Sequence, residues 1–184
     1  MNKEADYKFC PKCKGKFLKD KNNLLVCSQC KFHYYINPKL ANAIILKRDN
    51  NKILLVKRKV LPKIGWWDLP GGFVEINETL EQSMERETKE ELGICLKKYQ
   101  YFRSYYDNYL YQGINYATIC GVFIGKLSGN EKIKPEDDIS EAKFFLFKDI
   151  PFSKIAFSGL QKALQDYQSL FSLHQSQRSK SSKK

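Results

Sequence analysis

The chain has 184 residues, of which 42% are hydrophobic and 14% aromatic, enough for one domain with a sizeable core and a small appendage. No apolar run approaches the roughly 18 residues of a membrane span, and the first residues, MNKEADYKF, lack a signal peptide's apolar stretch, so we expect a cytoplasmic protein without membrane contact. The formal charge of +12 is concentrated at the ends: +6 in residues 1–40, +4 in 171–184 and only +2 between them. Basic ends attract phosphates or nucleic acids, but they also serve as solvated tails, so a nucleic-acid partner stays open without being favoured.

The N-terminal segment contains four cysteines in two CxxC pairs: Cys10, Cys13, Cys27 and Cys30. The residues between the pairs read as a hairpin with KDKNN as its turn. Four thiolates in tetrahedral array suit Zn²⁺, whereas disulfides need an oxidising compartment and a thioredoxin-like motif needs a βαβ setting. We therefore predict a zinc ribbon over residues 1–37, folded by its metal. Cys95 and Cys120 lie in apolar contexts and are expected in the core.

A second unit is predicted from Pro38 to residue 171. Its first half reads as strands at 41–47 and 52–58 around the turn Asp49-Asn50-Asn51, then an irregular Pro- and Gly-rich stretch. A helix follows at about 79–92, with Thr79 and Gln82 as a capping box and Gly93 as the C-cap.

The second half of this unit reads as three strands and a helix. The strands are expected at 99–106, 115–126 and 142–148. An amphipathic helix opens with Ser158 and Gln161 and carries apolar residues at helical spacing: Leu160, Leu164, Tyr167 and Phe171. Residues 172–184 have the composition of a disordered basic tail. This order predicts an α/β fold, a mixed sheet with helices on both faces.

The helix at 79–92 is rich in glutamate, and its acids are arranged unusually. At about 100° per residue, an apolar stripe runs along Leu80, Met84, Thr88 and Leu92. Glu87 and Glu91 fall on or beside that stripe, where burial is expected, whereas a solvated surface helix would turn its carboxylates outward. Burying like charges is costly without compensation, and neighbouring Arg86 and Lys89 lie on another side of the helix.

A bound divalent cation would compensate this cluster. Carboxylates without Cys or His ligands favour Mg²⁺, Mn²⁺ or Ca²⁺, and the spacing of an EF-hand is missing. Mg²⁺ typically binds one or two carboxylates together with substrate phosphates. A Glu-rich surface helix of no catalytic role is the competing interpretation.

Residues 72–94 resemble the Nudix box, G-x5-E-x7-R-E-U-x-E-E-x-G-U, where U is a bulky apolar residue. The matching positions are Gly72, Glu78, Arg86, Glu87, Glu90, Glu91, Gly93 and Ile94. Thr88 stands where an apolar residue is usual, which affects packing more than chemistry. The preceding WWDLPGG also resembles the family's approach to the box.

A zinc ribbon before a Nudix domain is similar to bacterial NADH pyrophosphatases and to plant plastid-type FAD and ADP-ribose pyrophosphatases. The segments INPKL, WWDLPGG, EAKFF and IPFSKIAFSGL resemble the plant group. The region YFRSYYDNYLYQGINY lacks the signature Ser-Gln-Pro-Trp-Pro-Phe-Pro-x-Ser of the bacterial enzymes, which argues against NADH specificity and decapping of NAD-capped RNA. The resemblance implies a Nudix-type α/β/α sandwich.

The resemblance also implies site roles. Glu87, Glu90 and Glu91 would bind Mg²⁺ or Mn²⁺ with the Gly71 carbonyl, and Arg86 would hold the helix through Glu78. In the loop before the last strand, Asp138 or Glu141 would add a ligand or a base. Aromatic residues that could stack on adenine or flavin follow the box, and three are candidates for the substrate site: Tyr105, Tyr106 and Tyr116.

The implied reaction is metal-assisted hydrolysis of the pyrophosphate in a nucleoside diphosphate linked to another group, as in FAD, ADP-ribose or NADH. A mononucleotide would be released. The alternatives are a nucleic-acid-binding module or a nucleotide sensor that keeps a non-catalytic Nudix fold. A homodimer, assisted by the ribbon, is a further expectation from the resemblance.

Overall fold

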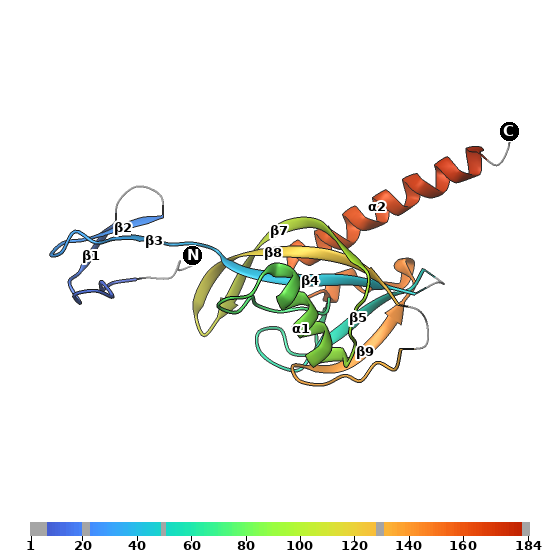
Figure 1. The fold of residues 1–184 in the computed structure, drawn as a ribbon, viewed down its shortest axis with the longest axis horizontal. Helices are drawn as coiled ribbons and strands as arrows, with labels where there is room; N and C mark the ends of the chain where they lie inside the picture. The colour runs from blue at the N-terminus through green and yellow to red at the C-terminus, as the bar shows by residue number, and fades with distance from the viewer. Residues whose placement is uncertain (1–6, 20–22, 49–50, 128–130, 182–184) are drawn as a thin grey trace.

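The computed structural model describes residues 7–19, 23–48, 51–127 and 131–181, with side chains described to residue 170 apart from that of Lys19. Its elements are, in chain order, β1 Phe17–Lys19, β2 Leu24–Cys27, β3 His33–Tyr35, β4 Lys39–Lys47, β5 Ile53–Arg58, β6 Trp67–Asp68, α1 Leu80–Leu92, β7 Tyr99–Tyr111, β8 Ile114–Lys126, β9 Ile139–Phe145, the 3₁₀ turns Phe147–Asp149 and Phe152–Lys154, and α2 Ser158–Ser181. Strands β1–β2–β3 form a small antiparallel sheet at one end of the molecule (Figure 1). The other six strands form a mixed sheet in the order β6-β5-β4-β8-β7, with β9 paired to β5.

Helices α1 and α2 cover opposite faces of the mixed sheet, which confirms the predicted α/β/α sandwich (Figure 1). Successive side chains of a strand point to opposite faces, so the apolar run of β4 supplies both cores. Ala43 and Ile45 pack in the cluster that contains α2 residues, and Ile44 and Leu46 pack in the cluster that contains α1 residues. A sheet buried on both sides thus holds α1 firmly in place.

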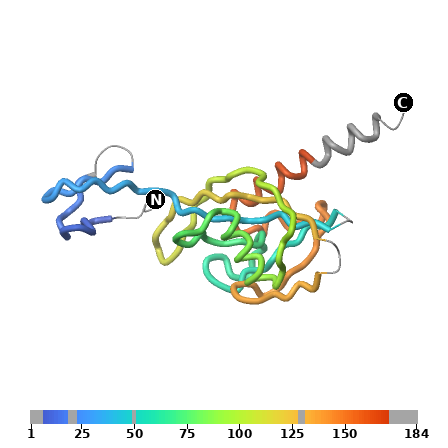
Figure 2. Tube along the Cα trace, viewed as in Figure 1, coloured from blue at the N-terminus to red at the C-terminus, as the bar shows by residue number. Residues whose placement is uncertain are grey.

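Strand β4 lies at the centre of the sheet and pairs in parallel with β8, from Lys39 opposite Thr118 to Lys47 opposite Lys126. The tube in Figure 2 shows these two segments running side by side although they are far apart in sequence. The predicted strands 41–47, 52–58 and 115–126 are present with small shifts at their ends. Their continuous apolar runs made these three strands predictable.

Two later strands differ from their predicted ranges. Strand β7 continues five residues past the predicted end at 106, because Gln112 and Gly113, both with positive φ, make a tight turn into β8. The Asp-Asn pair at 107–108 therefore lies within the strand. Strand β9 starts at Ile139 and ends at Phe145, where its partner β5 begins, so the predicted 142–148 is displaced.

Helix α1 has the predicted caps. The Thr79 and Gln82 side chains each accept a hydrogen bond from the other residue's backbone N–H, and Gly93 takes the left-handed conformation with φ 68°. Thr88 is fully buried on the apolar stripe, and its hydroxyl donates to the Met84 carbonyl at 2.7 Å. The polar atom at an apolar position is therefore satisfied within the helix.

Helix α2 begins at the predicted residue and is capped from β7. The Gly159 N–H donates to the carboxylate of Asp107 on β7 at 2.6 Å, and the Ser158 hydroxyl donates to the same carboxylate at 3.1 Å. A strand residue therefore provides the capping acceptor, while the Gln161 side chain donates to the Ile155 carbonyl.

The apolar face of α2 is buried as predicted through Leu160, Leu164 and Tyr167, while the side chain of Phe171 lies outside the described residues. The helical backbone extends to Ser181, into the segment 172–184 where composition predicts a disordered tail. No Gly or Pro follows Gly159 to end the helix. Residues 182–184 lie outside the described part.

The predicted turns at 19–23 and 49–51 fall mainly on residues 20–22 and 49–50, which also lie outside the described residues. The strands that flank each turn are antiparallel neighbours: β1 pairs with β2, and β4 pairs with β5. Within the ranges given above, no helix has both the length and the apolar character needed to cross a bilayer.

Candidate active site

Two glycines bring the loop after β6 against β4 and α1. The Gly71 backbone has φ 140°, and a Cβ there would lie 2.3 Å from the Asn42 carbonyl oxygen. At Gly72 a Cβ would lie 2.3 Å from Oε1 of Glu87. The Asn42 N–H donates to the Gly72 carbonyl at 2.9 Å, which fixes the loop beside the strand. Only glycine allows both close approaches.

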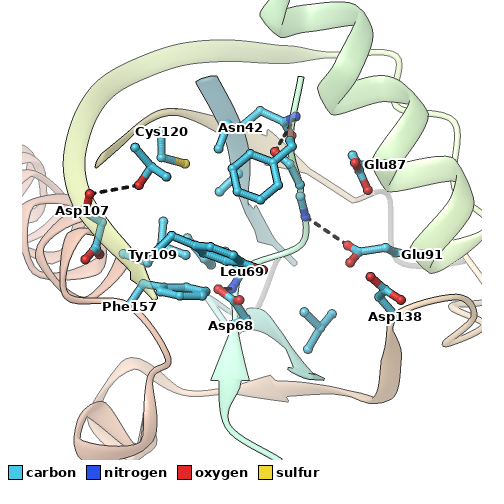
Figure 3. Close-up of a pocket in the computed structure, with 18 of the residues that line it drawn as sticks. Asn42, Asp68, Leu69, Glu87, Glu91, Asp107, Tyr109, Cys120, Asp138 and Phe157 are labelled. Atoms are coloured by element: carbon cyan, nitrogen blue, oxygen red, sulfur yellow. Dashed lines mark hydrogen bonds between the residues drawn. The ribbon is translucent and has the colours of Figure 1, made fainter. Parts of the chain in front are cut away.

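The carboxylates of Glu87 and Glu91 face this loop from α1 (Figure 3). The Gly71 N–H donates to Oε2 of Glu91 at 3.0 Å, and Glu91 is only 6% exposed. Burial raises the pKa of Glu91 to about 8, and the nearby charge of Glu87 adds to this rise. Burial also raises the pKa of Glu87. Both acids thus lie in a region where negative charge is poorly compensated, as the helical wheel predicted.

Arg86 anchors the acidic helix. Its Nε donates to Glu78 at 2.7 Å, and its Nη1 donates to Glu87 at 3.0 Å and to Glu90 at 2.9 Å. The pairing with Glu78 agrees with the role that the resemblance implied. The reach of Arg86 is wider than the wheel suggested, because its long side chain bridges three acids. Arg86 makes no hydrogen bond with Glu91, and the pKa of Glu91 is raised more than that of Glu87.

A pocket of about 320 Å³ opens beside these carboxylates. Its other side is aromatic: the rings of Tyr109 and Phe157 stack with centroids 5.6 Å apart and planes inclined by 26° (Figure 3). The Arg58 guanidinium lies 5.2 Å from the Phe157 ring centroid and donates to Asp68 at 2.9 Å. Burial raises the pKa of Asp68 to about 6 against the opposing effect of Arg58. The pocket therefore joins an acidic wall to an aromatic one.

The structure brings six of the predicted site residues together around this pocket: Gly71, Arg86, Glu87, Glu91, Asp138 and Tyr105. Figure 3 shows Asp138 directed toward Glu91 from the loop before β9.

Four other predicted residues are not among those that line the pocket: Glu90, Glu141, Tyr106 and Tyr116. Glu90 is half exposed beside Arg86, Glu141 pairs with Lys57, and Tyr106 follows Tyr105 on β7 and so points to the opposite face. Tyr116 pairs with Tyr109 across β7 and β8. Their roles stay predictions.

Five pocket residues were given no role from the sequence: Asn42, Arg58, Asp68, Asp107 and Phe157. Tyr109 belongs to the aromatic residues after the box that could stack on a base, but it was not among the three candidates for the substrate site. Period-two alternation from Tyr105 places Asp107 and Tyr109 on the same face of β7, a signal that was missed because the strand was predicted to end at residue 106. The Arg58–Asp68 pair joins two strands whose adjacency becomes visible only in the fold.

The four cysteines of the N-terminal segment converge on one point. Their sulfurs all lie within 4.8 Å of one another, with Cys10 and Cys30 3.8 Å apart and Cys13 and Cys27 3.4 Å apart. Tetrahedral Zn²⁺ with bonds of about 2.3 Å separates its sulfurs by about 3.8 Å. The cluster fits a metal site and, with its cysteines unpaired, not a pair of disulfides. Backbone N–H groups, that of Cys30 foremost, lower the pKa of Cys27 to about 6, which favours the thiolate.

The acidic wall also has the chemistry of a cation site, although it is less convergent. Among the described residues, the cysteines alone form a group of at least three His, Cys, Asp or Glu ligand atoms within 4.8 Å of one another. The carboxylates of Glu87, Glu91 and Asp138 are therefore more widely spread, as expected for like charges with Arg86 drawing Glu87 aside. Oxygen donors alone suit a hard divalent cation, and the raised pKa values of Glu87 and Glu91 show where positive charge would stabilise the fold.

Comparisons with known proteins agree with this geometry. The family model described as NUDIX domain matches residues 38–167. The ADP-ribose pyrophosphatase of Methanocaldococcus jannaschii is 39% identical over 137 residues, covering 74% of this chain and 77% of that protein. The NAD-capped RNA hydrolase NudC of Vibrio atlanticus is 31% identical over 147 residues, which cover 78% of this chain but only 51% of that relative. The chain thus spans about half the length of this NudC protein.

Solved structures show the same fold. A NUDIX hydrolase from Nitrosomonas europaea superposes with a TM-score of 0.65 and 32% identity, covering 87% of this chain and 89% of that one. The domain match, the identity to relatives and the position of the glutamates on α1 all agree. The chain belongs to the Nudix hydrolase family.

Proposed function

We propose that this protein hydrolyses the pyrophosphate of a nucleoside diphosphate linked to another group, with ADP-ribose as the substrate to test first. The observation that carries the proposal is the pair of buried Glu91 and partly buried Glu87, which faces a pocket with an aromatic wall opposite. The similarity to an ADP-ribose pyrophosphatase over most of both chains supports this substrate class. The products would be a mononucleotide and a phosphorylated second group.

The chain's own residues would divide the work as follows. Glu87 and Glu91, with Glu90 or Asp138 added, would hold Mg²⁺ or Mn²⁺, which draws charge from phosphoryl oxygens and lowers the pKa of an attacking water. Arg86 orients Glu87 through its 3.0 Å hydrogen bond, and the Gly71 N–H orients Glu91.

The pocket would orient the substrate between its two walls. Its volume of about 320 Å³ is near the lower end of small-molecule sites, so it accommodates one nucleotide half and leaves the other toward solvent. The face of the Tyr109–Phe157 pair offers a flat apolar surface for a base. The acidic wall then receives the phosphates only through cations, since bare carboxylates repel them.

A substrate panel tests the proposal. Purified protein with Mg²⁺ or Mn²⁺ is incubated with ADP-ribose, FAD or NADH, and released AMP is measured by ion-exchange chromatography. Glu91→Gln should abolish release, whereas Glu85→Gln on the exposed side of the same helix should retain it, because Glu85 contacts Tyr99 outside the pocket. Absence of AMP from all three substrates with either cation would refute the proposal.

Three further parts of the proposal concern the rest of the chain. The cysteine cluster would hold structural Zn²⁺, which metal analysis of the purified protein tests. Reduced thiols are maintained in the cytoplasm, where we place the protein. A homodimer is proposed from the resemblance, and light scattering after size-exclusion chromatography would show a monomer if this is wrong.

A further inference from the structure

One face of the ribbon sheet carries exposed apolar side chains. Residues directly opposite in an antiparallel sheet share a face, as do residues two apart in one strand. Phe9 bridges to Lys16. Leu18 on β1 pairs with Val26 on β2, which in turn pairs with His33 on β3, and Leu24 pairs with Tyr35. By this register one face, termed here the outer ribbon face, carries Phe9, Lys16, Leu18, Leu24, Val26, His33 and Tyr35.

The small core of the ribbon lies on the other face. Leu25 and Cys27 are buried there, and the Phe17 and Tyr34 rings pack with centroids 5.8 Å apart. On the outer ribbon face, by contrast, Phe9 is 61% exposed and Tyr35 is 60% exposed. Leu18 is exposed to the same degree. The Nudix domain does not cover these side chains, since the ribbon stands at the end of the molecule (Figure 1). Large apolar groups thus face solvent without serving the fold.

The charge of the ribbon is predominantly positive outside its metal site. Its described segments, 7–19 and 23–37, contain no Asp or Glu and six lysines: Lys8, Lys12, Lys14, Lys16, Lys19 and Lys31. Residues 1–37 as a whole hold eight lysines and three acids, and four thiolates around one Zn²⁺ carry −2, so the ribbon remains near +3. Lys16 lies on the outer ribbon face itself, opposite Phe9.

We propose that the outer ribbon face binds single-stranded nucleic acid. Aromatic rings interleaved with lysines are the recurring composition of such surfaces: bases stack on the rings and phosphates contact the ammonium groups. Phe9 and Tyr35 would be the stacking residues, and Lys16, directly opposite Phe9, would contact a phosphate. A second copy of this chain fits the face less well, because two ribbons of charge near +3 would repel each other.

This binding is separate from the catalytic pocket and does not depend on hydrolysis. Zinc-loaded full-length protein, without added Mg²⁺ or Mn²⁺, is titrated into a fluorescein-labelled 20-nucleotide RNA, the same sequence as DNA, and the duplex of that DNA. Anisotropy gives the Kd in each case. We expect saturable binding to single strands, weaker binding to the duplex, and a Kd that rises with salt because contacted phosphates release counterions. The two single-stranded arms distinguish RNA from DNA as the source of the ligand.

Matched variants locate the surface. Phe9→Ala and Tyr35→Ala should each raise the Kd at least about fivefold, the lower range for losing one stacked base. Tyr101→Ala removes a ring that is also exposed, to 53%, but lies on the Nudix domain, and should change the Kd less than about twofold. Lys16→Glu should flatten the salt dependence, whereas Lys97→Glu, the same charge change on the Nudix domain, should not.

Zinc content equal to wild type shows that each variant ribbon is folded. Equal losses in Tyr35→Ala and Tyr101→Ala, or in the two lysine variants, would overturn the proposal, because binding would then be unspecific. Duplex binding as tight as single-strand binding would overturn the stacking role. If the wild-type protein does not bind nucleic acid and forms a dimer that dissociates in Tyr35→Ala, the outer ribbon face would instead be assigned to contact with a second copy.

Discussion

The close contact between Gly72 and Glu87 allows a quantitative prediction. The substitution Gly72→Ala places a methyl carbon 2.3 Å from Oε1, 2.5 Å from Cδ and 2.9 Å from Oε2 of Glu87. Ordinary non-bonded contact lies at about 3.5 Å, so the carboxylate must move by about 1 Å. The backbone at this residue has no positive φ that a side chain would strain. The added methyl therefore acts on the acidic wall rather than on the loop's conformation.

A displacement of about 1 Å at a catalytic group costs on the order of 100-fold in turnover. We expect kcat/KM for AMP release to fall by about that factor in Gly72→Ala, with a weaker apparent affinity for Mg²⁺. Gly113→Ala is the matched control: it has positive φ at the tip of the β7–β8 turn and open space around its Cβ. It should lower stability by about 1 kcal/mol and leave turnover unchanged.

A double variant tests the cause. Gly72→Ala with Glu87→Asp shortens the displaced side chain by one methylene, so the two losses should not add, and the double variant should be no worse than Glu87→Asp alone. Steady-state kinetics over a range of Mg²⁺ concentrations measure all four proteins. Activity of Gly72→Ala within threefold of wild type, or strictly additive losses, would show that Glu87 does not need its position against this loop.

Three further outcomes are expected. In protein without added Mg²⁺ or Mn²⁺, the Glu91 carboxyl, with its pKa near 8, keeps a proton that the unfolded chain loses near pH 4.5, so stability should fall between these values. Glu91→Gln should remove this fall from a plot of melting temperature against pH. A plot whose slope is unchanged in the variant would refute the prediction. Arg86→Ala should lower turnover about 10- to 100-fold in steady-state kinetics with Mg²⁺. Arg86→Lys should not restore turnover, because a single ammonium does not reproduce the branched contacts of the guanidinium with Glu78 and Glu90. Cys27→Ser should lose zinc by elemental analysis and expose the ribbon to protease while the Nudix domain resists; a protected ribbon would contradict the metal's role.

Helix α1 shows how much of the site follows from sequence alone. Its caps, its buried stripe and the inward position of Glu87 and Glu91 all follow from the 3.6-residue period and from local hydrogen bonds. These are short-range properties, and the Nudix box adds the pairing of Arg86 with Glu78. The zinc cluster could be predicted from the sequence equally well, because two CxxC turns already bring thiolates into pairs.

The aromatic wall could not be read in the same way. Tyr109 comes from β7 and Phe157 from the loop before α2, and only the tertiary fold stacks them. The cap of α2 is also tertiary, since Asp107 reaches it from β7. Of the predicted tyrosines, Tyr106 lies away from the pocket because the neighbouring position, Tyr105, takes the inward face.

The parallel pairing of β4 with β8 constrains when the site can exist during synthesis. Nine residues of β4 pair in parallel with residues 118–126, about 80 positions later, and the acidic helix lies between the two strands in the sequence. Until residue 126 leaves the ribosome, α1 has no completed platform beneath it, and closing so long a loop is slow. A peptide cut to the Nudix box would therefore carry the carboxylates without the surface that aims them.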